Sequence, residues 1–134
     1  MSASDRIVGR REYDGVLIVE ADIADHRIRL LVDTGCAVSA ITPGTVDLLG
    51  LDRGTFTGRR AVFTAGRASM TVPTGRIPML RLGAVELRDV EVALMDLPPG
   101  VAVDGLLGVN VLDHFRVTFD FRHATLVLRP EPLR

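Results

Sequence analysis

The sequence predicts an all-β protein, a small closed barrel or sandwich with one or two short helices. Three observations point to this class. Short runs rich in Val, Ile and Leu follow one another closely, and turn residues such as Gly, Asp and Pro separate them. Clear helix signals occur at only one or two places. The 134 residues, 47% of them hydrophobic, suit a single domain with its own core over residues 1–134.

The first predicted hairpin leads to the most distinctive stretch of the chain. Residues 16–23 and 27–32 are two apolar-rich runs, and the turn-like residues 24–26 connect them. The second run ends at Asp33, which a Thr-Gly turn follows. An aspartate between a hydrophobic strand and a tight turn should be half buried and firmly held, unlike a mobile surface charge. Such a carboxylate is suited to take part in a chemical reaction.

One helix and several further strands follow. A strand resumes over residues 38–41, and Thr42-Pro43 then has the pattern of an N-cap and a proline at the first helical position. The helix is expected near residues 43–49, with Gly50 as its stop. Residues 52–60 read as a loop. Further short strands are predicted over residues 61–64, 70–72, 77–82, 85–87 and 90–95, the first two of them as a hairpin.

The last third of the chain predicts a loop and a final hairpin. Two prolines and a glycine mark the loop at residues 98–100. Residues 115–121 and 125–128 read as two strands of a hairpin. The tail from Arg129 contains two prolines and is expected to be loose.

Two motifs, in this order, resemble those of a known family. The first, Asp33-Thr34-Gly35 after an apolar run, resembles the active-site motif of aspartic peptidases, and its single copy resembles their retropepsin-like branch. The second, Leu106-Leu107-Gly108, resembles the family's two apolar residues and glycine, which a short helix with Asn110 and Leu112 follows. The resemblance covers about residues 14–128. It implies a retropepsin-like acid-protease fold in which the second motif lies beside the catalytic turn and its glycine allows two backbones to approach closely.

The resemblance also implies a role for each residue of the site. Asp33 is the catalytic aspartate, Thr34 reaches the partner backbone across a homodimer, and Gly35 lets a peptide pass and helps to hold the carboxylate. The residues implied to contact substrate are Cys36, Ala37, Leu106 and, at the tip of a flap that closes over the peptide, Thr64, Ala65 and Gly66. From the residues alone, the flap reads equally well as a plain surface hairpin. Cys36 reads either as a small apolar filler or as a site where oxidation stops activity.

Hydrolysis needs more than one carboxylate. Attack of water on a peptide carbonyl needs a base and an acid, and two carboxyls that share one proton supply both. The chain has one Asp-Thr-Gly, and Asp104 near the second motif lacks the Thr-Gly that follows Asp33. The sequence therefore predicts a homodimeric aspartic endopeptidase that acts on peptides or proteins. The alternative is a retropepsin-like domain that serves dimerisation or peptide binding without hydrolysis.

Two further features bear on recognition and on the dimer. Viral members of the family carry an aspartate shortly after Asp-Thr-Gly and an arginine directly after the apolar-apolar-Gly motif. Here residues 36–39 and Val109 carry no charge, so an apolar contact is expected in place of that ion pair. For the dimer contact, residues 117–119 and 125–128 are expected to offer strand edges.

Composition and spacing argue against other functions. A net charge of −1 without a basic or acidic block argues against nucleic-acid binding. The 3 histidines and the single cysteine show no metal-ligand spacing, so we expect no metal and no cofactor. Residues 1–12 are polar and charged, so neither a secretory signal nor a membrane span is expected. One cysteine fits a reducing compartment, and we predict a cytoplasmic location.

Overall fold

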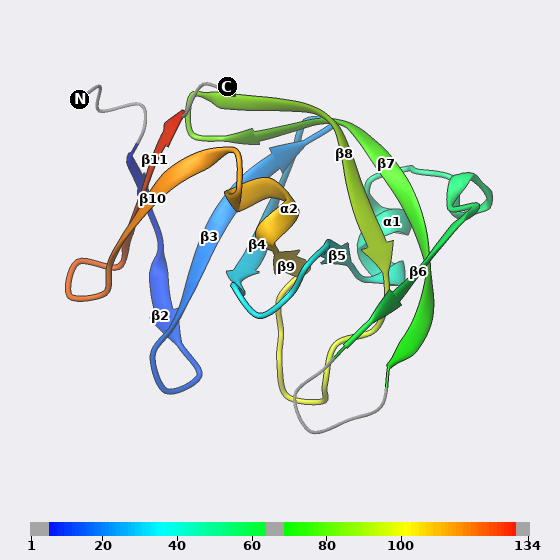
Figure 1. Cartoon of the computed structure of the whole chain (residues 1–134), viewed down its shortest axis with the longest axis horizontal. Helices are drawn as coiled ribbons and strands as arrows, with labels where there is room; N and C mark the ends of the chain where they lie inside the picture. Colours follow the sequence, from blue (N-terminus) through cyan, green and yellow to red (C-terminus); the bar gives the residue numbers. More distant parts are fainter. Residues whose placement is uncertain (1–5, 64–68, 131–134) are drawn as a thin grey trace.

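The computed structural model describes residues 6–63 and 69–130, and these residues are mostly in β-strands (Figure 1). The strands in these ranges are β1 Arg6–Val8, β2 Arg10–Glu12, β3 Val16–Ile23, β4 His26–Val32, β5 Ser39–Ile41, β6 Gly58–Val62, β7 Met70–Leu82, β8 Val85–Leu94, β9 Gly105–Leu107, β10 Phe115–Asp120 and β11 Thr125–Pro130. The helices in the same ranges are α1 Pro43–Leu48, the short 3-10 helix η2 Arg53–Thr55, and α2 Val109–Leu112. None of these described helices is long and apolar enough to cross a membrane. The predicted all-β class with short helices is confirmed.

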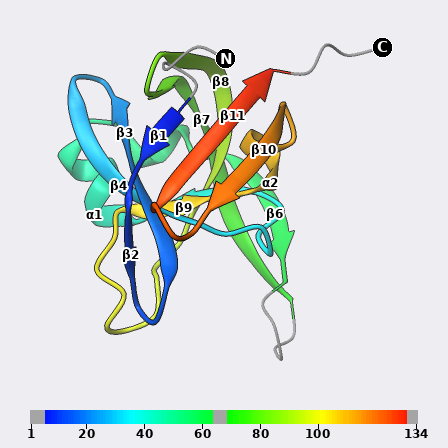
Figure 2. The same ribbon diagram turned by 90° about the vertical axis from the view of Figure 1, so that its left-hand side faces the viewer.

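The strands form a closed barrel with a smaller sheet beside it. Eight strands are hydrogen-bonded in the order β2-β3-β4-β9-β5-β8-β7-β6, and three in the order β1-β11-β10. β3 also pairs with β7 at Asp22 and Arg81, which closes the run from β3 to β7 on itself. The closed barrel that the sequence predicted is therefore present. Figure 2 shows the smaller sheet, with β11 between β1 and β10.

Two clusters of buried hydrophobic residues lie inside the described part of the molecule. The larger cluster joins the barrel, both α-helices and the smaller sheet, and its most deeply buried members are Leu17, Val19, Ile28, Val46, Ile77, Leu82, Leu107, Val111, Leu126 and Leu128. The smaller cluster contains Val38, Ala40, Val62, Val72 and Ala93, with Leu106 and Met95 packed against it. Burying one such side chain contributes about 1.5–3 kcal/mol relative to leaving it in water. The smaller cluster therefore fastens the β6–β7 hairpin to the strand that follows the Asp-Thr-Gly turn.

The elements around the Asp-Thr-Gly turn agree with the sequence. β3 and β4 pair antiparallel across a turn in which Ala24 and Asp25 have positive φ angles of 48° and 64°. α1 begins at Pro43, and the hydroxyl of Thr42 accepts a hydrogen bond from the Thr45 amide at 3.2 Å, as an N-cap does. Gly50 follows the helix with a φ of +70°, the left-handed conformation that glycine adopts easily. The predicted hairpin and helix are confirmed.

β7 and β8 are longer than the sequence predicted. The strands expected at residues 70–72 and 77–82 are parts of one strand, β7, and those expected at 85–87 and 90–95 are parts of β8. Pro73 and Pro78 both lie within β7. At Pro73 the registered partner is Arg59 of β6, and past Thr74 the partners of β7 come from β8 instead. Pro73 lies before the pairing with β8 begins, and Pro78 has no registered partner in β8. A strand tolerates a missing N–H at such positions.

The segment expected to be a loop, residues 52–60, is partly structured. η2 occupies its first half, and β6 begins at Gly58, earlier than the predicted start at residue 61. Pairing with β7 defines these residues as a strand, because Gly58 lies opposite Thr74. A Cβ atom at Gly58 would lie 2.3 Å from the Thr74 hydroxyl oxygen, so a larger residue there would require the Thr74 side chain to move.

The N-terminal segment forms two strands that the sequence did not reveal. β1 and β2 occupy residues 6–12, ahead of the expected start of the fold near residue 14. Most of their side chains are exposed, and Ile7 is the buried member of β1. These edge strands are too short and polar to show hydrophobic alternation, because they bury few side chains.

The pairing within the smaller sheet decides which strand edges are free, and it differs from the prediction at one of them. β11 lies between β1 and β10, with Arg6 opposite Val127 on one side and Thr118 opposite Val127 on the other. Residues 125–128 therefore do not offer a free edge, and that prediction is wrong because β1 of the same chain already occupies it. In the described residues β10 pairs with β11 alone, so residues 117–119 keep one edge open. The tail expected to be loose from Arg129 is ordered as far as Pro130, where β11 ends.

Candidate active site

Asp33 is held at its main chain and at its side chain. It directly follows β4, and its amide donates a hydrogen bond of 3.0 Å to the carbonyl of Leu107 on β9. The Cys36 amide donates to the Asp33 carbonyl at 3.2 Å and closes the turn. The Gly35 amide donates to the Asp33 carboxylate oxygen Oδ1 at 2.9 Å. The carboxylate is thus half buried and fixed in direction, as the sequence predicted, while Thr34 and Gly35 are exposed.

The second motif lies beside the Asp-Thr-Gly turn. β9 runs parallel to β4, with Leu107 opposite Val32, and antiparallel to β5. A Cβ atom at Gly108 would lie 2.7 Å from the Cys36 carbonyl oxygen, closer than real Cβ atoms approach backbone. The Val109 amide donates to the same carbonyl at 2.8 Å. The predicted contact between the two motifs, and the need for glycine at position 108, are confirmed.

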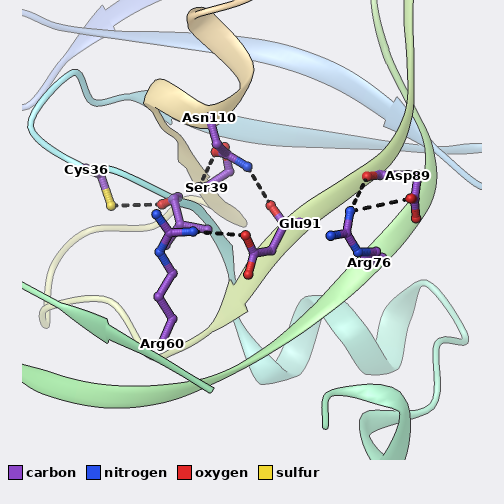
Figure 3. A network of polar contacts seen from close by, with 8 residues as sticks. Cys36, Ser39, Arg60, Arg76, Asp89, Glu91 and Asn110 are labelled. Carbon is purple, nitrogen blue, oxygen red and sulfur yellow. Dashed lines mark hydrogen bonds and ion pairs between the residues drawn. The ribbon is translucent and has the colours of Figure 1, made fainter. Parts of the chain in front are cut away.

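Ser39 and Asn110 lock the turn to α2 and β8. The amide and the hydroxyl of Ser39 both donate to Oδ1 of Asn110, at 2.7 and 2.9 Å. The Gly108 amide donates to the Ser39 hydroxyl at 2.9 Å. Nδ2 of Asn110 donates to the Glu91 carbonyl at 2.8 Å (Figure 3). Sequence reasoning noted Asn110 as part of the motif but missed Ser39. The only available signal was a small hydroxyl residue in an otherwise apolar strand.

Asp104 has a structural role. Its carboxylate oxygen Oδ2 accepts a hydrogen bond from the Arg29 amide at 2.8 Å. Its main-chain carbonyl accepts from the Thr42 amide at 3.1 Å and from the Thr45 hydroxyl at 3.2 Å. These contacts join β4 and β9 to the start of α1. Its described partners are therefore structural groups away from the Asp-Thr-Gly turn.

The residues expected to contact substrate are partly described. Ala37 is exposed, Cys36 is half buried, and Leu106 is half buried against the smaller hydrophobic cluster. The expected flap-tip residues Thr64, Ala65 and Gly66 lie outside the described residues. The hairpin that carries them is present as β6 and β7, and Phe63 and Met70 at its ends are 74% and 51% exposed. The roles of these residues in substrate binding stay predictions.

Two charged residues influence the thiol of Cys36. Partial burial raises the pKa of this thiol, and the nearby Asp33 carboxylate raises it further. The positive charge of Arg60 on β6 opposes the increase in pKa. The thiol itself donates to the Val38 carbonyl, with a Sγ to oxygen distance of 3.0 Å. Arg60, which the sequence did not single out, is therefore close enough to the Asp-Thr-Gly turn to act on it electrostatically.

A groove with aromatic walls lies next to Thr34. Its lining includes Val32, Thr34, Phe119 and Phe121, and its volume is about 480 Å³. The two phenylalanine rings are stacked with 5.8 Å between centroids, and the Arg11 guanidinium lies 5.7 Å from the Phe121 centroid. Phe121 is 48% exposed. Hydrophobic surface is thus open to solvent directly beside the Asp-Thr-Gly turn.

Within residues 6–63 and 69–130, no group of three or more His, Cys, Asp or Glu side chains is placed to hold a metal ion.

Comparisons with known proteins agree with this geometry. The family model described as aspartyl protease matches residues 19–111. A search of curated proteins found no significant match. The chain is similar to a retropepsin-like aspartic protease from Rickettsia conorii, with 22% identity, a TM-score of 0.69, and coverage of 92% of this chain and 89% of that chain. It is also similar to the retroviral protease-like domain of Ddi1 from Leishmania major, with 21% identity, a TM-score of 0.60, and coverage of 90% and 97%. The fold is therefore retropepsin-like, as the sequence predicted.

Proposed function

The chain belongs to the aspartyl protease family, and on this premise we propose that it is an aspartic endopeptidase that hydrolyses peptides or proteins. One observation carries the proposal. The Asp33 carboxylate projects from an exposed turn, and the Gly35 amide holds one of its oxygens at 2.9 Å. The other carboxylate oxygen has no hydrogen bond to any described residue, which leaves it available to a water molecule.

The proposed reaction uses two copies of Asp33. One ionised carboxylate removes a proton from water while the other, protonated, donates its proton to the peptide carbonyl oxygen. The water oxygen bonds to the carbonyl carbon and gives a tetrahedral intermediate. When the C–N bond breaks, a proton passes to the leaving amine. Two close carboxyls retain one shared proton, because both cannot ionise easily at short range.

We infer that the second Asp33 comes from a second copy of the chain. Among the described residues, no other carboxylate contacts Asp33. Thr34 and Gly35 are exposed in the single chain, and the groove with Phe119 and Phe121 adds hydrophobic surface beside them. A two-fold axis through the Asp-Thr-Gly turn would cover this surface and bring the two carboxylates together. The open edge of β10 is a further candidate for the contact.

The first test is Asp33→Asn. The amide oxygen can keep the hydrogen bond from Gly35, so the fold should persist, but the base is lost. Cleavage of a diverse peptide pool should fall by about 10²-fold or more. Asp25→Asn removes the same charge from the β3–β4 turn and should leave cleavage unchanged. A purified Asp33→Asn variant that cleaves as fast as the parent would refute the mechanism, and peptide binding by a parent that never cleaves would favour the non-catalytic alternative.

The second test is the pH dependence of the cleavage rate. A pair of carboxyls that shares one proton is competent only when one is ionised and the other protonated. The rate should therefore follow a bell with an acidic-to-neutral optimum and decline once both carboxyls ionise. A rate that climbs steadily into the alkaline range, or that a chelator abolishes, would indicate a different nucleophile or a metal.

A further inference from the structure

An ion pair formed by residues outside the two motifs lies next to the Asp-Thr-Gly turn. Nη1 of Arg60, on β6, donates to Oε1 of Glu91, on β8, at 2.9 Å. The two side chains are 40% and 30% exposed. Residues 36–39 and Val109 are uncharged. Besides Asp33 itself, the charge that acts on Cys36 comes from Arg60 on the hairpin strand.

The strand geometry directs Arg60 toward residues 36–39. Side chains two positions apart on a strand share one face, so Arg60 and Val62 lie on the same side of β6. Val62 is buried in the smaller hydrophobic cluster with Val38 and Ala40. Arg60 therefore belongs to the face of the hairpin that covers the strand after the Asp-Thr-Gly turn. Its charge also acts on the Cys36 thiol, which agrees with this placement.

The ion pair is anchored to the network that holds the turn. The Glu91 carbonyl accepts a hydrogen bond from Nδ2 of Asn110, and Oδ1 of the same Asn110 binds Ser39. Figure 3 shows the Arg60 guanidinium on the side of Glu91 that faces Cys36. A guanidinium has five N–H donors, and Glu91 is the only hydrogen-bond partner that the described residues give to Arg60. Several donors thus remain for a ligand beside the turn.

We propose that Arg60 is a specificity-determining residue that binds an acidic side chain of the peptide, so that the protein prefers Asp or Glu at one fixed position of its substrate. The inference rests on the proposed function, because it concerns a peptide bound at the same turn. A carboxylate can form a paired, charge-assisted hydrogen bond with the free edge of a guanidinium. A Lys or Arg side chain at that position would meet the positive charge and be disfavoured.

The test compares cleavage of one randomised peptide pool by the parent and by Arg60→Gln. The parent should cleave peptides with Asp or Glu at one position about tenfold faster than those with Asn or Gln. Arg60→Gln should lose this difference, and Arg60→Lys should keep part of it. Arg59→Gln removes the same charge one residue away, on the opposite face of β6, and should keep the full preference. Each variant's thermal unfolding shows whether it is folded.

Glu91→Gln separates the two members of the ion pair. If Arg60 selects the substrate, removing its competitor should strengthen the acidic preference. A parent that instead prefers Lys or Arg at this position, and loses that preference in Glu91→Gln, would overturn the proposal. An acidic preference that Arg60→Gln leaves unchanged would overturn it as well.

A binding experiment distinguishes failure of this inference from failure of the proposed function. The same pool is captured on immobilised Asp33→Asn protein, with and without Arg60→Gln. Enrichment of acidic peptides that depends on Arg60, in a protein whose parent does not cleave, would refute the peptidase and support this inference. Cleavage by the parent without any acidic preference would support the peptidase and refute the inference.

Discussion

At the scale of the residue, the turn itself fixes Asp33, and neighbours from distant parts of the chain decide what surrounds it. The Gly35 amide and the Leu107 carbonyl restrain the aspartate from within the two motifs. Arg60 adds a positive charge from the hairpin, and Cys36 adds a thiol. Among these groups, only the Cys36 thiol has a reactivity that can be measured directly and that depends on the local charges.

We predict that Cys36 reacts slowly with alkylating reagents. Burial and the Asp33 charge raise the pKa of its thiol, so at neutral pH a smaller fraction is the reactive thiolate than in an ordinary cysteine. Mass spectrometry should show slower labelling by iodoacetamide in the folded protein than in urea at pH 7.5, and the rate should rise as pH increases. Asp33→Asn removes one cause of the higher pKa and should speed up labelling of the folded protein. Folded protein that reacts as fast as unfolded protein would contradict the proposed environment.

At the scale of the element, β9 and the β6–β7 hairpin determine the shape of the site. β9 is inserted between β4 and β5, and on the β5 side it needs a small residue, because a Cβ atom at Gly105 would lie 2.1 Å from the Ala40 carbonyl oxygen. The hairpin is tied to β5 by the smaller hydrophobic cluster and to β8 by the Arg60–Glu91 ion pair. Displacing β9 should therefore disturb the Asp-Thr-Gly turn more than a change elsewhere in the barrel.

We predict that Gly108→Ala reduces both stability and activity. The new Cβ would lie 2.7 Å from the Cys36 carbonyl oxygen, so β9 and the turn must separate. Overpacking of this kind costs about 1–3 kcal/mol of the free energy of unfolding. Gly44→Ala, in α1, is the matched control, because its Cβ has no neighbour within 4 Å. Urea unfolding of both variants measures the difference, and equal stabilities would contradict the close approach.

At the scale of the whole molecule, the proposed two-fold dimer determines whether the site is complete. A single chain presents one Asp-Thr-Gly, an exposed Thr34, and the groove with Phe119 and Phe121. The smaller sheet closes one potential contact, since β1 pairs with β11 inside the chain, and leaves the β10 edge open among the described strands. The dimer contact is thus expected at the turn and at β10, and no longer at residues 125–128.

We predict that activity depends on a symmetric homodimer. An interface that persists at micromolar concentration should bury about 1,200 Å² or more in total. Specific activity should fall on dilution, and sedimentation should show the dimer dissociating over the same concentration range. Mixing the parent with excess Asp33→Asn should reduce activity beyond simple dilution, because a mixed dimer holds only one competent carboxylate. A fully active monomer would show that the second acid lies within the chain.

The sequence by itself determined the features that depend on neighbouring residues. The β3–β4 hairpin, the N-cap and stop of α1, and the Asp-Thr-Gly turn all follow from local signals, because each is set by the conformational preferences of a few consecutive residues. The apolar-apolar-Gly motif was recognisable for the same reason. The retropepsin-like fold and the central aspartate could therefore be predicted before any coordinates were known.

The tertiary structure alone decided which distant segments meet. β7 continues through Pro73 and Pro78 because strands on either side pair with it, and β1 is a strand because β11 lies beside it. Ser39 meets Asn110 across 71 positions of the chain, and Arg60 meets Glu91 across 31. Such pairings depend on how the barrel closes, and no local propensity encodes them. The Asp-Thr-Gly motif could therefore be recognised in the sequence, whereas the Arg60 charge beside it could not.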